Sequence, residues 1–126
     1  MANNPVGWFE IYVDDLDRAQ QFYQNVLAIS LQELGDPSDS TLQMLAFPSD
    51  MEKYGASGAL TKMNDLPAGG NSTLVYFSCD DCAIEESRVE KAGGRVHRSK
   101  MSIGEYGFIS LALDSEGNMF GLHSLK

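Results

Sequence analysis

Basic residues, histidines and cysteines are scarce in this chain of 126 residues. Nine Lys and Arg stand against 18 Asp and Glu, which gives a formal net charge of −9 at pH 7. A surface of this charge repels phosphate backbones, which excludes nucleic acid as an expected partner. No apolar run approaches the ~18 residues that a membrane-spanning helix needs, and the first residues lack the pattern of a signal peptide. We therefore expect a cytoplasmic protein that binds neither nucleic acid nor membranes.

The two cysteines, Cys79 and Cys82, form a Cys-x-x-Cys pattern where a strand meets a helix. A zinc site would need two further ligands, and the only two histidines lie far off in the sequence. A redox pair would need a thioredoxin-like context, which the second half of the chain resembles only loosely. The favoured interpretation is that Cys79 and Cys82 take the core positions that Val13 and Leu16 take in the first half, because free Cys often behaves as a small buried hydrophobe.

The chain repeats one pattern. Residues 8–16 predict a strand that runs into an Asp-capped helix, and residues 74–82 repeat it. We expect a single domain over 1–126, with module one at about 5–63, a linker at about 64–71 and module two at about 72–126. Each module is predicted as β-α-β-β-β. The predicted fold class is α+β, with two tandem modules that form a curved mixed sheet around a cavity and place the helices on the outside.

Hydrophobic periodicity places the elements. In the first strand, Phe9, Ile11 and Val13 are predicted to face a helix, while Trp8, Glu10 and Tyr12 face the other side. Asp14 and Asp15 are candidate helix N-caps. Helices are predicted over 16–27 and 82–92, a turn over 35–40, and further strands over 41–47, 58–62, 95–98, 108–113 and 119–124.

Three groups of residues carry a resemblance to a known family. They are Val13–Ala19 with Phe22-Tyr23 and Val26-Leu27, then Ala92-Gly93-Gly94, then Leu113–Asn118 with Gly121-Leu122. In their order and spacing the chain resembles the vicinal oxygen chelate superfamily, which includes glyoxalase I, bleomycin-resistance proteins and extradiol dioxygenases. The resemblance implies four metal-ligand positions, which fall here on Trp8, on Gly58 or Ala59, on Leu74 and on Gly121. None of these side chains can bind a metal, whereas a catalytic metal needs about three protein N or O ligands, so we expect no metal and no cofactor.

Two polar side chains remain on the predicted inner face. Strand parity turns Glu10 and His123 toward the cavity, and we predict them as a catalytic pair in which a carboxylate orients an imidazole for acid-base chemistry. Three alternatives stay open: a mutually satisfied buried pair, a solvated His123, or a relocated metal site that uses both. The predicted ligand-binding residues are Trp8, Tyr12, Leu74, Tyr76, Phe108 and Gly121. Met51, Tyr54, Tyr106 and Phe108 are predicted near the mouth.

The sequence supports three hypotheses about function. The first is a metal-free homodimer that binds an aromatic or amphipathic small molecule, as the resemblance to the bleomycin-resistance branch implies; the negative charge suits a cationic ligand. The second is a glyoxalase-related lyase or isomerase in which Glu10 and His123 transfer protons without a metal, and a metalloenzyme with relocated ligands is a variant of it. The third is a structural or regulatory domain with a collapsed cavity.

Overall fold

The computed structural model describes residues 6, 8–34, 41–50, 52–71 and 73–126. The first half contains β1 (Trp8–Tyr12), α1 (Leu16–Leu27), β2 (Gln32–Leu34), β3 (Leu42–Ala46) and β4 (Ser57–Met63). The second half contains β5 (Tyr76–Ser78), α2 (Cys82–Val89), β6 (Arg95–Ser102), the short helix η1 (Gly104–Tyr106), β7 (Phe108–Leu113) and β8 (Met119–Ser124). The turn predicted over 35–40 and Met51, predicted near the mouth, lie outside the described residues.

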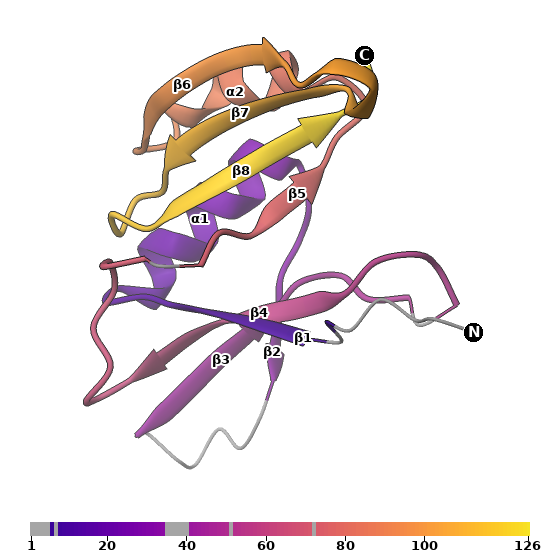
Figure 1. The fold of residues 1–126 in the computed structure, drawn as a ribbon. Helices are drawn as coiled ribbons and strands as arrows, with labels where there is room; N and C mark the ends of the chain where they lie inside the picture. Colours follow the sequence, from indigo (N-terminus) through magenta and orange to yellow (C-terminus); the bar gives the residue numbers. More distant parts are fainter. Residues whose placement is uncertain (1–5, 7, 35–40, 51, 72) are drawn as a thin grey trace.

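Each half forms its own four-stranded mixed sheet. The order is β1-β4-β3-β2 in sheet one and β5-β8-β7-β6 in sheet two. In both, the strand before the helix pairs in parallel with the last strand of its half, and the remaining pairs are antiparallel. The predicted α+β fold of two βαβββ units is confirmed. Figure 1 shows the two sheets splayed apart, with α1 behind the seam between them and α2 behind sheet two.

Helix α1 is the main packing element of the core. Asp15 caps it by accepting a hydrogen bond from the Arg18 backbone N–H at 3.1 Å, as the sequence predicts. Its apolar stripe is buried through Ala19, Phe22, Tyr23 and Val26. These residues pack with the core-facing side chains of both sheets, so one hydrophobic core joins the two halves. No helix in the described part of the chain is long and apolar enough to cross a membrane.

Helix α2 is shorter than predicted and ends at Val89. The chain then turns to Gly93, whose φ of 105° is in the left-handed region that favours glycine. The strand predicted over 95–98 continues to Ser102 because an irregular pairing of β6 with β7 extends it. Cys82 is fully buried and Cys79 half-buried, both as free thiols, as the core interpretation predicts. Burial raises the pKa of Cys79 to about 12, with a further contribution from Glu85.

The turn between β7 and β8 holds the two halves together. Asp114 is buried and accepts a hydrogen bond from the Tyr23 hydroxyl at 2.7 Å. Glu116 accepts hydrogen bonds from the backbone N–H groups of Asp14 and Asp15 and from Arg18, at 2.6 to 3.1 Å. Every one of these donors comes from the first half of the chain. The acidic turn is therefore an anchor that docks sheet two onto the start of α1.

Candidate functional site

The predicted faces of the strands are correct, but they do not form one cup in this chain. Glu10 lines one recess and His123 lines another, and each has its own hydrogen-bond partners. The structure does not bring Glu10 and His123 to one recess of the single chain. The physical reason is that β1 and β8 lie in different sheets, with the shared core between their core-facing sides.

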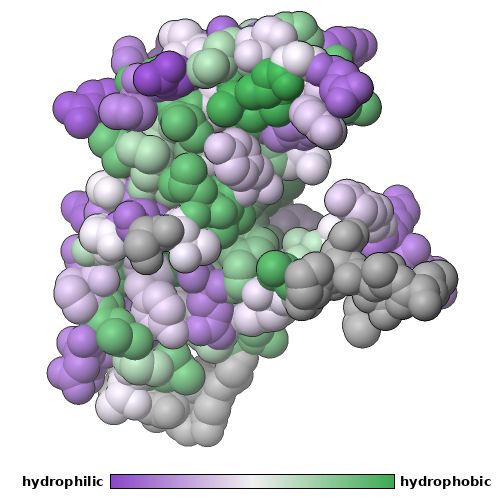
Figure 2. Space-filling model, in the orientation of Figure 1, coloured by the Kyte–Doolittle hydropathy of each residue, from purple (hydrophilic) through white to green (hydrophobic). Residues whose placement is uncertain are grey.

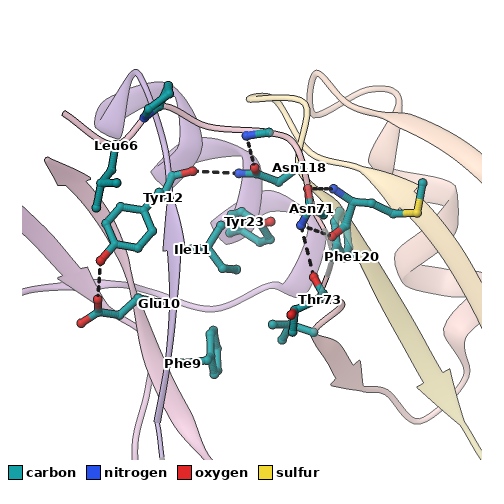
Figure 3. Close-up of a pocket in the computed structure, with 14 residues that line it drawn as sticks. Phe9, Glu10, Ile11, Tyr12, Tyr23, Leu66, Asn71, Thr73, Asn118 and Phe120 are labelled. Atoms are coloured by element: carbon teal, nitrogen blue, oxygen red, sulfur yellow. Dashed lines mark hydrogen bonds between the residues drawn. The ribbon is translucent and has the colours of Figure 1, made fainter. Parts of the chain in front are cut away.

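Glu10 lies in a recess of about 460 Å³ beside the linker, which Figure 3 shows in close-up. Its carboxylate accepts hydrogen bonds from the Tyr12 hydroxyl at 2.9 Å and from Trp8 Nε1 at 3.2 Å. The hydrogen bond to Glu10 raises the pKa of Tyr12. Across the recess, Asn118 donates to the Tyr12 carbonyl and Asn71 fixes the linker against β8 (Figure 3). The polar groups here satisfy one another, which is typical of a structural network.

A second and larger recess of about 840 Å³ opens between the two sheets. We call it the inter-sheet recess. It is lined by residues of β1, α1 and the segment after it, the loop between β3 and β4, the start of β4, β5, α2, Ile103, β7 and β8. In Figure 2 the surface is hollowed between the upper and lower parts of the molecule, and apolar residues border the hollow. A volume of this size accommodates a small organic ligand, since ligand sites typically span roughly 300–1,000 Å³.

Aromatic rings form much of the wall of the inter-sheet recess. Phe9, Phe47 and Phe77 lie with ring centroids 5.5 to 6.0 Å apart. Tyr76 and Tyr54 complete the aromatic wall, with 44% and 90% of their surface exposed. Gly121 leaves room for the Tyr76 ring, because a Cβ at that position would lie 2.2 Å from it. An apolar body that enters the recess can therefore stack on several rings.

Two ionisable side chains line the same recess. The imidazole of His123 contacts the Tyr106 carbonyl oxygen with Nε2 at 2.7 Å, and because a carbonyl only accepts, Nε2 carries the proton. Glu85, on α2, has one carboxylate oxygen, Oε1, that is buried and has no hydrogen-bond partner among the described residues. A buried polar atom without a partner is costly, so this oxygen sets Glu85 apart from the satisfied carboxylates elsewhere.

Trp8 lies in an adjoining recess of about 410 Å³. This recess shares Tyr54, Ser57 and other residues of the β3–β4 loop with the inter-sheet recess. Trp8 is 45% exposed, although its indole N–H is bonded to Glu10. An exposed indole next to a ligand-sized hollow is available for contact with a bound molecule.

The other predicted ligand-binding residues lie elsewhere. Leu74 lines a small recess at the linker, and neither Phe108 nor Gly121 lines any of the four recesses described here. Phe108 instead contacts Lys100, whose Nζ lies 4.7 Å from the centroid of its ring. The structure thus brings Tyr76, Tyr54 and His123 to one recess and separates them from Tyr12, Leu74 and Phe108.

The positions that hold the metal in the superfamily do not fit one here. Strand pairing decides between Gly58 and Ala59: Ala59 pairs with Glu10 and shares its sheet face, whereas Gly58 lies against the Phe9 ring on the core side. The four positions that the resemblance implies are then Trp8, Ala59, Leu74 and Gly121, which offer no side-chain oxygen, sulfur or imidazole. Within the described part of the chain, no group of three or more His, Cys, Asp or Glu could hold a metal ion.

Sequence reasoning did not identify Glu85 as a candidate site residue. A signal was present, because Glu85 lies three residues after Cys82 and four before Val89, the two buried residues of α2. Residues three and four apart share a helix face. The spacing therefore puts Glu85 on the buried side, where a carboxylate is unexpected.

Comparisons with known proteins agree with this fold. A model of the bleomycin resistance protein-like N-terminal family matches residues 6–36. No curated protein sequence matches the chain. Glyoxalase I from Zea mays superposes with a TM-score of 0.73 at 21% identity, over 93% of this chain and 43% of that one, so the chain spans less than half the maize protein.

Two bacterial structures match over almost their whole length. An antibiotic binding protein from a Streptomyces species has a TM-score of 0.66 at 22% identity, covering 98% of both chains. A glyoxalase/bleomycin resistance protein from Albidiferax ferrireducens has a TM-score of 0.65 at 17% identity, covering 94% of this chain and 98% of that one. The resemblance to the vicinal oxygen chelate superfamily is confirmed for the fold.

Proposed function

We propose that this chain, which has the glyoxalase/bleomycin-resistance-like fold of the vicinal oxygen chelate superfamily, is a metal-free protein that binds an aromatic or amphipathic small molecule. The observation that carries the proposal is apolar and aromatic surface beside ligand-sized hollows, at positions where the resemblance implies metal ligands. Trp8, Ala59, Leu74 and Gly121 stand at those implied positions, and Trp8 and Tyr76 are large, exposed and close to the hollows. Exposed aromatic surface beside a recess of about 840 Å³ is typical of ligand binding.

The printed description of the Streptomyces neighbour, an antibiotic binding protein, supports the same function. That protein has this fold over its full length, whereas the maize enzyme is more than twice as long as the region matched. Fold alone does not decide function, so the site residues carry the argument.

A homodimer in the cytoplasm is part of the proposal. Sheet one carries Trp8 and Glu10 on one face and sheet two carries Tyr76 and His123, and within one chain Glu10 and His123 line separate recesses. A second copy related by a two-fold axis would place sheet one of each subunit against sheet two of the other. Light scattering coupled to gel filtration tests this, with twice the chain mass as the expected result and a monomer as the contradicting one.

The alternative function is a lyase or isomerase that uses Glu10 and His123. It requires the carboxylate and the imidazole to meet on one substrate. In the single chain they line separate recesses, so only a second copy could join them. Binding without turnover is therefore the function that the geometry supports better.

Calorimetric titration with phenylbutanol, an uncharged amphipathic probe, tests the proposal in buffer that contains a chelator. We expect saturable binding, and we expect Trp8→Ala to weaken it about tenfold through loss of aromatic contact. Leu66→Ala is the matched control, because Leu66 is equally exposed at 43% but lines only the linker recess. No binding by the native chain, or the same loss in both variants, would contradict the proposal.

A further inference from the structure

Among the described residues that line the inter-sheet recess, Glu85 is the sole carboxylate, and Lys and Arg are absent. Oε1 of Glu85 is buried without a hydrogen-bond partner. A withdrawn carboxylate is stabilised when a cation pairs with it, and among the described residues no ion pair to Glu85 is formed. We propose that the recess binds an organic ammonium ion whose charged head pairs with Glu85 and whose apolar body lies on the rings of Phe9, Phe47 and Phe77.

The aromatic wall favours the same charge. Aromatic faces attract ammonium groups through the negative face of the ring. Tyr54 and Tyr76 are exposed toward the solvent side of the recess, where they can hold such a group as it enters. The chain's net charge of −9 attracts cations at longer range.

Among the polar groups of the recess, Glu85 is the one proposed to pair with the cation. His123 donates its Nε2 proton to the Tyr106 carbonyl. The Cys79 thiol, which interacts with Glu85 through the carboxylate charge and a side-chain hydrogen bond, stays neutral because burial raises its pKa to about 12. Among the described residues neither forms an ion pair with the Glu85 carboxylate. A bare metal ion is a poorer fit than an organic cation, since the described residues hold no group of three metal ligands.

The inference rests on the proposed binding function and narrows it to a ligand class. Three probes of similar shape separate the two claims: phenylbutylammonium, phenylbutanol and phenylbutyrate, titrated calorimetrically into the native chain. We expect phenylbutylammonium to bind about tenfold more tightly than phenylbutanol, as a charge-assisted hydrogen bond predicts, and phenylbutyrate to bind most weakly.

The decisive variant is Glu85→Gln, with Glu90→Gln as its matched control. Glu90 is an exposed glutamate at the end of α2 and lies outside the recess, so both variants remove one negative charge from the same helix. We expect Glu85→Gln to abolish the preference for phenylbutylammonium over phenylbutanol and Glu90→Gln to keep it. Retained phenylbutanol affinity in Glu85→Gln shows that the recess is intact.

The variant Tyr54→Ala tests whether the probes bind in the inter-sheet recess. Tyr54 is 90% exposed, so its removal leaves the core untouched, and we expect all three probes to weaken together. Equal affinity for phenylbutylammonium and phenylbutanol, or a preference that survives Glu85→Gln, would overturn the cation site while the binding function stands. Failure of every probe to bind would overturn both.

Discussion

Glu116 and Glu85 are glutamates of the same half of the chain, both withdrawn from water, and they differ in their partners. The Glu116 side chain is fully buried and accepts hydrogen bonds from two backbone N–H groups, the Arg18 guanidinium and the Ser115 hydroxyl. Glu85 has a buried oxygen with no partner among the described residues, beside an open recess. A buried carboxylate whose oxygens all accept hydrogen bonds stabilises the fold, whereas a carboxylate at a cavity wall with an oxygen that accepts none indicates a binding role.

Glu116→Gln should have the largest effect on stability. The amide keeps one acceptor oxygen but has an NH₂ group in place of the oxygen that accepts from Arg18 Nε and the Ser115 hydroxyl, so the junction between the halves loses charge-assisted hydrogen bonds. We expect the free energy of unfolding to fall by about 3 kcal/mol, measured by urea denaturation. Glu105→Gln, at an exposed glutamate of η1, is the control and should change little. Equal stability of the two variants would show that Glu116 is not an anchor.

Tyr23→Phe should have the next largest effect. It removes the hydroxyl that donates to Asp114 at 2.7 Å inside the core and leaves that carboxylate with fewer donors. We expect a loss of about 2 kcal/mol in the same assay. Tyr54→Phe removes a hydroxyl from a 90% exposed ring and should have no measurable effect. A stable Tyr23→Phe variant would mean that the Asp114 bond adds nothing to the junction.

Low pH should weaken the contact between the two halves that Glu116 makes. Burial opposes ionisation of Glu116, but the hydrogen bonds from Arg18, Asp15 and Ser115 outweigh it and lower its pKa from 4.5 to about 2. Because the folded pKa is below the unfolded one, the stabilisation is complete above about pH 5 and is lost as the pH falls toward 2. Burial raises the pKa of Asp114, which acts in the opposite direction.

The difference in stability between the native chain and Glu116→Gln isolates the Glu116 contribution. We expect this difference to shrink as the pH is lowered from about 5 to 2. Urea titrations at a series of pH values measure it. A constant difference across that range would contradict the assignment.

Glu85→Gln should have the smallest effect and the opposite sign. A neutral amide costs less to withdraw from water than a carboxylate without a partner, so we expect the free energy of unfolding to rise by about 1 kcal/mol. Glu90→Gln, at an exposed position, should leave it unchanged. Thermal unfolding in the absence of ligand makes the comparison. A clear loss of stability in Glu85→Gln would mark that residue as structural.

Much of this fold could be predicted from local patterns. The alternation of Phe9, Ile11 and Val13 and the capping Asp15 are encoded within a few residues, and the structure has the same faces and the same cap. The repeat of the strand-helix pattern predicted two equivalent βαβββ modules in one curved mixed sheet, and in the structure each module forms its own four-stranded sheet.

The relation between the sheets could not be predicted in the same way. Strand parity predicts the side of the sheet on which Glu10 and His123 lie, but it does not predict how the two sheets are placed relative to each other. That placement depends on the packing of α1 and on the contact between Arg18 and Glu116, which are 98 residues apart in the sequence. The inter-sheet recess likewise depends on the path of the β3–β4 loop, where no periodicity constrains the chain.

The most direct test of metal-free small-molecule binding uses Trp8, the single tryptophan of the chain. Its fluorescence is followed during titration with phenylbutanol, once in buffer with a chelator and once with added nickel, zinc, manganese or iron(II). Metal-free small-molecule binding predicts a saturable change with the same midpoint in every buffer. A change that appears only when a divalent metal is added would contradict the account.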